Sequence, residues 1–89
     1  MGQDMLKSKL KFEMMQEVVQ ETGILTWGAT CRPYSFVISY GAPGKVYRCS
    51  WKNQVFKFAE THYLPTEYEN IYEAMAACET QLSRLKGMI

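Results

Sequence analysis

The one histidine and the three cysteines are the residues whose chemistry could support nucleophilic catalysis or metal binding. Cys31, Cys49 and Cys78 are widely spaced and form no CxxC pair. A Cys–His nucleophile would need His62 beside one of these thiols. Two of the cysteines instead fall at apolar-face positions, where a free thiol acts as a small hydrophobe. A histidine-based metal site would also need carboxylate or thiolate partners, and none is suitably spaced. We therefore expect no enzyme activity, no metal and no cofactor.

The glycine-rich stretch from Gly41 to Gly44 has some likeness to a phosphate-binding loop, because Lys45 follows it. That motif needs four residues between its glycines and a serine or threonine after the lysine. Here two residues intervene and Val46 follows. The stretch also opens a run typical of a strand rather than a helix. It predicts a hairpin turn, and we expect no small-molecule substrate.

Three runs alternate apolar and polar residues with a period of two, as half-buried strands do. They are residues 34–40, 46–51 and 55–59, and short connections make them antiparallel neighbours. Residues 24–30 form either a fourth strand or a loop that lays Trp27 on the core. One face of this sheet is strongly aromatic; its members are Tyr34, Phe36, Ile38, Tyr40, Tyr47, Cys49, Trp51, Phe56 and Phe58.

Two helices flank the expected strands. The first is expected from Asp4 to about Thr22, with Gly23 as its C-terminal stop. The second is expected to follow a capping box in which Thr66 and Glu69 satisfy each other's amides. These helices are the covers available for the aromatic face. The expected fold is therefore α+β: a helix, a three- or possibly four-stranded antiparallel meander and a helix, with both helices on the aromatic face.

Length and composition indicate one intracellular domain spanning residues 1–89. Hydrophobic residues make up 47% of the chain, which excludes a disordered segment. The net charge of +1 gives the whole molecule no strong attraction to nucleic acid or membrane. No signal peptide or membrane-length apolar run is evident, and the odd, scattered cysteines suit a reducing, cytoplasmic setting.

The expected first helix has an apolar face wider than one sheet contact needs. This excess predicts either a thoroughly buried helix in a small core or a helix shared with a second chain. In the second case the oligomer contact consists of Leu6, Leu10, Met14 and Met15. Methionines suit such an adaptable contact.

Positive charge gathers in the central part of the chain. From Ile24 to Glu60 there are five cations and one carboxylate. The alternation of the strands places several polar residues on the face opposite the aromatic one. The residues of this candidate nucleic-acid or partner face are Lys45, Arg48, Ser50, Lys52 and Lys57. The alternative is an ordinary solvated surface.

The predicted topology of residues 34–85, three antiparallel strands followed by a packed helix, resembles the arm-type DNA-binding domains of tyrosine integrases. That resemblance implies a sheet face laid in the major groove. The order helix, three strands, helix is also that of double-stranded RNA-binding domains. Their basic motif at the start of the last helix is absent, because Thr66 to Glu69 is acidic here.

Together these patterns favour a non-catalytic module that binds a protein, either another copy of itself or a larger protein to which it acts as a stoichiometric inhibitor or adaptor. The alternative function is nucleic-acid binding on the basic sheet face.

Overall fold

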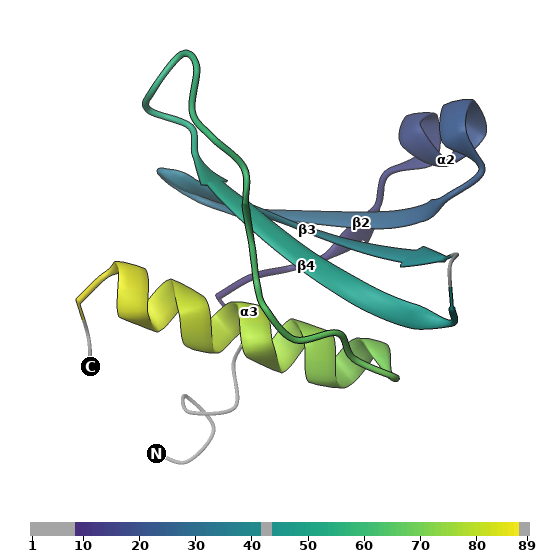
Figure 1. The fold of residues 1–89 in the computed structure, drawn as a ribbon. Coiled ribbons are helices and arrows are strands. Elements are labelled where there is room, and N and C mark those ends of the chain that lie inside the picture. Colours follow the sequence, from purple (N-terminus) through teal and green to yellow (C-terminus); the bar gives the residue numbers. More distant parts are fainter. Residues whose placement is uncertain (1–8, 42–43, 88–89) are drawn as a thin grey trace.

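The computed structural model describes residues 9–41 and 44–87, and it has an antiparallel sheet of five strands plus two helices (Figure 1). The α+β class is therefore confirmed. In chain order the elements are β1 (Glu13–Met14), α2 (Gln16–Thr22), β2 (Leu25–Cys31), β3 (Tyr34–Gly41), β4 (Val46–Asn53), β5 (His62–Tyr63) and α3 (Ile71–Leu85). The strands lie in the sheet in this same order.

The three long strands β2, β3 and β4 form a regular meander at the centre of the sheet. Leu25 lies opposite Tyr40 at one end of the β2–β3 pair, and Cys31 lies opposite Tyr34 at the other end. The first two predicted runs are therefore strands, and the alternative of a strand over residues 24–30 is confirmed. Short β1 and β5 pair with the two outer edges of this meander.

Helix α3 covers one face of the sheet, which we call the inner face. Phe36 and Ile38 of β3 and Cys49 of β4 are almost fully buried there against α3. The helix contributes Ala74, Cys78 and Leu82, which recur every four residues and so share one stripe. The aromatic face predicted from alternation is this inner face for β3 and β4.

Helix α3 begins later than the sequence pattern predicts. Asn70 is its N-cap and accepts a hydrogen bond from the amide of Glu73 at 3.0 Å. The predicted capping box at Thr66 is wrong, because Tyr68 exchanges two backbone hydrogen bonds with Tyr47 at 2.7 and 2.9 Å. This bridge keeps the chain extended along the edge of β4 and delays the helix.

Helix α2 is short and does not lie on the aromatic face. It contains no buried residue, contacts β2, and lies on the side of the sheet away from α3 (Figure 1). The prediction that both helices cover the aromatic face is therefore wrong for this helix. Its predicted end is correct, since Gly23 is a left-handed cap with φ of 75°.

The segment before α2 is not helical from residue 9 onward, and the predicted start at Asp4 lies outside the described residues. The Leu10 amide donates to the Glu79 carboxylate of α3 at 2.8 Å. Further on, Met14 pairs with Trp27 and the Met15 amide donates to Thr26. The edge of β2 thus holds this segment in an extended form.

The third predicted strand, residues 55–59, is a loop. The Asn53 side chain accepts a hydrogen bond from the amide of Val55 at 2.9 Å, which ends β4 in an Asx turn. Two further turn hydrogen bonds, from Phe56 to Asn53 and from Ala59 to Phe56, reverse the chain. As a result Phe56 and Phe58 lie outside the core, and their predicted place on the aromatic face is wrong.

Candidate functional site

The reactive side chains are dispersed or buried. His62 of β5 stacks on Trp51 of β4, with ring centroids 4.4 Å apart and planes at 23°. Cys49 and Cys78 are buried in the core, whereas Cys31 is half-buried at the end of β2. Among residues 9–41 and 44–87, no group of three or more His, Cys, Asp or Glu side chains is arranged to hold a metal ion.

The two buried thiols are neighbours in the core, Cys49 on β4 and Cys78 on α3. The Cys49 thiol donates to the carbonyl of Ala74 at 3.6 Å, one helical turn before Cys78. The side-chain interaction with Cys78 outweighs burial and lowers the pKa of Cys49, whereas the same interaction and burial together raise the pKa of Cys78. The raised pKa makes Cys78 a poor nucleophile. Cys49 is 1% exposed, so a substrate cannot reach its thiol. The pair therefore suits packing rather than chemistry.

The face of the sheet away from α3, which we call the outer face, brings part of the predicted basic set together. Cross-strand pairing places Ser35 opposite Lys52, Val37 opposite Ser50, and Ser39 opposite Arg48. Cross-strand partners project on the same side of a sheet, so Arg48, Ser50 and Lys52 share the outer face.

The remaining members of the basic set lie elsewhere. Lys45 is exposed just before β4, and Lys57 is on the loop after β4 rather than on the sheet. Arg48 forms a salt bridge with Glu67, its Nε donating to the carboxylate at 2.8 Å. The outer face is thus less basic than the sequence predicts.

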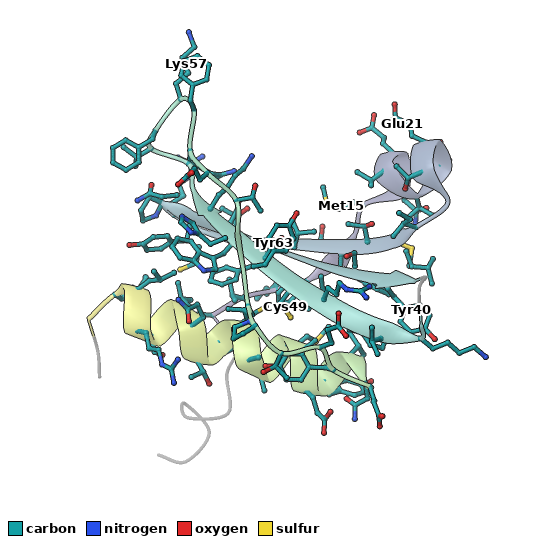
Figure 2. The ribbon with its side chains drawn as sticks, in the orientation of Figure 1. Met15, Glu21, Tyr40, Cys49, Lys57 and Tyr63 are labelled. Carbon is teal, nitrogen blue, oxygen red and sulfur yellow. The ribbon has the colours of Figure 1, made fainter. Side chains whose placement is uncertain are left out.

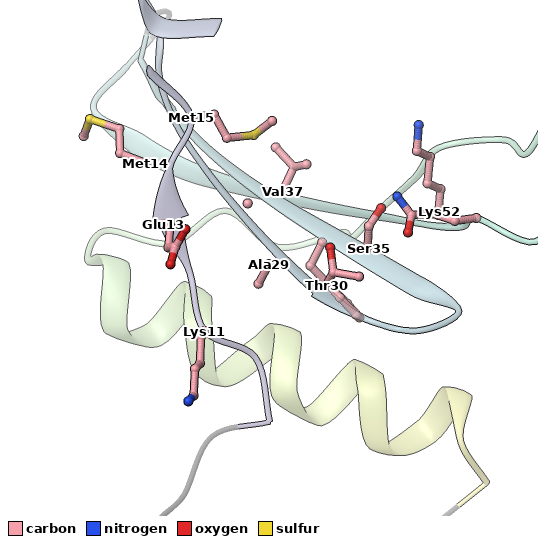
Figure 3. A pocket seen from close by; sticks show the side chains of 12 residues that line it. Lys11, Glu13, Met14, Met15, Ala29, Thr30, Ser35, Val37 and Lys52 are labelled. Carbon is pink, nitrogen blue, oxygen red and sulfur yellow. The ribbon is translucent and has the colours of Figure 1, made fainter. Parts of the chain in front are cut away.

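A groove of about 540 Å³ crosses the outer face beside β1 (Figure 3). Met15 forms one wall, and Val37, Ser35 and Lys52 lie along the sheet floor and far side. Gly28 permits this arrangement, because a Cβ at that position would lie 2.9 Å from the Met15 sulfur. The groove combines apolar and polar lining and is open to solvent.

The candidate oligomer residues do not share one helical face. Leu10 is 3% exposed and packs in the core of this same chain, so its predicted role between chains loses its basis. Leu6 lies outside the described residues. Met14 and Met15 are each 37% exposed and lie on opposite sides of the sheet edge, since neighbouring residues of an extended segment alternate.

Three exposed apolar residues lie together on a loop that sequence reasoning assigned to the sheet. We call residues 55–58 the apolar loop: Val55, Phe56, Lys57 and Phe58. It projects beyond one end of the sheet, and Figure 2 shows Lys57 at its tip. Val55 is 69% exposed, Phe56 64% and Phe58 87%. The available signal was Asn53 followed by polar Gln54, which is typical of a chain leaving a strand.

No helix among the described residues is long and apolar enough to cross a membrane. Comparison with known proteins adds no assignment: no family model, no curated protein and no solved structure matches this chain.

Proposed function

We propose that the chain is a non-catalytic module that binds another protein, with the apolar loop as its main contact. The observation that carries this proposal is the exposure of Val55, Phe56 and Phe58 together on one projecting loop. Burying a fully exposed phenylalanine side chain in a partner contributes about 1.5–3 kcal/mol. Aromatic anchors of this kind commonly dominate protein interfaces when they enter a pocket of the partner.

The local structure of the loop supports such a role. The backbone N–H of Gln54 donates a hydrogen bond to the carbonyl of Pro33 at 2.7 Å. This bond ties the base of the loop to the turn between β2 and β3. The Lys57 ammonium lies 5.7 Å from the centre of the Phe58 ring, within the range of a cation–π contact. A tethered base reduces the conformational entropy that the loop loses on binding.

A photo-crosslinking amino acid at position 58 tests the proposal in the cells that make the protein. Tyr72 is the matched control, because it is an aromatic residue on α3 and is 77% exposed. We expect a discrete crosslinked protein from position 58, and its loss when Phe56 is changed to serine. Identical products from positions 58 and 72, or none from position 58, would refute the role of the loop.

A second candidate function is nucleic-acid binding on the outer face. One observation favours it: within the described part of the chain, α3 packs on the inner side of β3 and β4, and α2 contacts β2. The outer face of β3 and β4 is therefore accessible to a flat or grooved partner. Lys52 and Arg48 supply positive charge there, although Glu67 offsets that of Arg48.

A further inference from the structure

The exposed apolar side chains gather at the two opposite ends of the sheet. Seven of the nine large apolar residues that are exposed in the described part of the chain fall into two groups. One group follows β4 and is the apolar loop. The other occupies β1, the residue after it and the start of β2; its members are Met14, Met15, Ile24 and Leu25.

The two groups carry opposite charge. From Glu13 to Leu25 the chain has three glutamates, at positions 13, 17 and 21, and neither lysine nor arginine. We call this segment the acidic end. Three cations lie around the apolar loop: Lys52, Lys57 and Arg32. Arg32 is in the turn between β2 and β3 and lines a pocket together with Val55. We call the apolar loop together with these three cations the basic end. One carboxylate, that of Glu60, follows shortly after the loop in the sequence.

One molecule cannot join its own two ends. Strand β2 begins at the acidic end with Leu25 and finishes beside the basic end with Cys31. Seven extended residues span about 20 Å. Figure 2 shows Glu21 and Lys57 far apart at opposite ends of the sheet. The acidic end and the basic end are held apart within one chain, but the acidic end of one copy can contact the basic end of another.

We propose that the basic end of one copy docks on the acidic end of a second copy, in a head-to-tail contact. This inference rests on the proposed function, since it names the protein partner that the apolar loop takes. Phe56 and Phe58 cover Met15 and Ile24 of the second copy, while Lys57 and Arg32 face its glutamates. A contact between two different surfaces leaves one of each unoccupied, so copies add further until a ring closes or a filament forms.

Sedimentation of the full chain and two variants tests the head-to-tail contact. The first variant carries Phe56→Ser and Phe58→Ser at the basic end; the second carries Glu21→Lys and Ile24→Ser at the acidic end. All four positions are exposed, so circular dichroism should show that both variants keep the fold. We expect the wild type to form species that grow between about 10 µM and about 1 mM. Raising the salt from about 50 to about 500 mM should weaken them several-fold.

Mixing the two variants is the decisive measurement. Each variant alone keeps one working end and should remain monomeric, but an equimolar mixture should form a dimer that does not grow further. Its affinity should match one wild-type contact within about threefold. A wild type that stays monomeric, an association that both variants retain, or a mixture without a dimer would each overturn the head-to-tail contact. A crosslink from position 58 to a different protein would contradict the proposal that the partner is a second copy of this chain. It would leave the proposed function, binding of a protein through the apolar loop, intact.

Discussion

Arg48 of β4 and Glu67 are joined by a salt bridge of 2.8 Å that crosses from the outer face to the segment preceding α3. Their side chains are 34% and 50% exposed. At such exposure an ion pair contributes only about 0–1 kcal/mol to stability. The carboxylate has a larger consequence for recognition, because it offsets positive charge on the face where a nucleic acid would lie.

Replacing Glu67 by glutamine should therefore raise any affinity of the outer face for duplex DNA about two- to fivefold at low salt. The double variant Arg48→Ala, Lys52→Ala should lower it. Since Lys57 is off the sheet, at most Lys45, Arg48 and Lys52 reach phosphates, and the salt slope should be near −2.7. Titration of labelled duplex and single strands measures these values. Absence of binding at about 50 mM salt would remove nucleic-acid binding as a candidate.

A second prediction contrasts two phenylalanines that the alternation pattern assigned to the same face. Phe36 is fully buried, whereas Phe56 is exposed on the apolar loop. Phe36→Ala should destabilise the fold by about 3–5 kcal/mol, because it leaves a cavity beneath α3. Phe56→Ala should change stability by less than about 0.5 kcal/mol. Urea unfolding of both variants checks this, and a large cost at Phe56 would contradict the loop assignment.

The sequence was sufficient to predict the strands of the meander that have a neighbouring strand on each side. The long strands alternate apolar and polar residues, and their buried members on the inner face are Phe36, Ile38 and Cys49. A shift of the strand register by one residue would expose these side chains, so the register is strongly specified. The stripe of Cys78 and Leu82 likewise predicted the buried side of α3. In these cases local pattern and tertiary packing favour the same structure.

The failures have a common physical cause: a tertiary or turn contact overrode the local pattern. Residues 55–59 alternate like a strand, but the Asn53 side chain caps the Val55 amide and turns the chain away. The segment before Gln16 has a helical apolar pattern, yet the open edge of β2 pairs with it. The candidate site was missed for the same reason, since Phe58 becomes a surface residue only once the third strand is lost.

A third prediction separates the expected helix cap from the observed one. Asn70→Ala should destabilise the protein by about 1 kcal/mol, because the Glu73 amide loses its acceptor at the start of α3. Thr66→Ala, which removes the cap expected from the sequence, should have an effect near zero. Thermal and urea unfolding of the two variants give the comparison. Equal costs, or a larger cost at Thr66, would place the helix start earlier in the chain.

The last prediction concerns alkaline pH and the buried thiols. In the unfolded chain Cys49 and Cys78 both ionise near pH 8.5. In the folded protein the shared hydrogen bond and burial raise the pKa of Cys78, so that thiol keeps its proton to higher pH. Below about pH 8.5 the lowered pKa of Cys49 acts in the opposite direction, because the folded state releases that proton before the unfolded chain does, and the free energy of unfolding rises with pH. Above it the unfolded state binds fewer protons, so the free energy of unfolding should fall by about 1.4 kcal/mol per pH unit.

Urea unfolding of the wild type and the variants between about pH 7 and pH 10 measures this slope. The double variant Cys49→Ala, Cys78→Ala should lose stability at every pH through reduced packing, but it should also have a shallower slope above about pH 8.5. Cys31→Ala is the matched control for the removal of a thiol, because that half-buried residue lies outside the pair. Equal slopes in the wild type and the double variant would mean that the folded pair loses both protons as readily as the unfolded chain. Such a result would contradict the raised pKa of Cys78 on which the prediction depends.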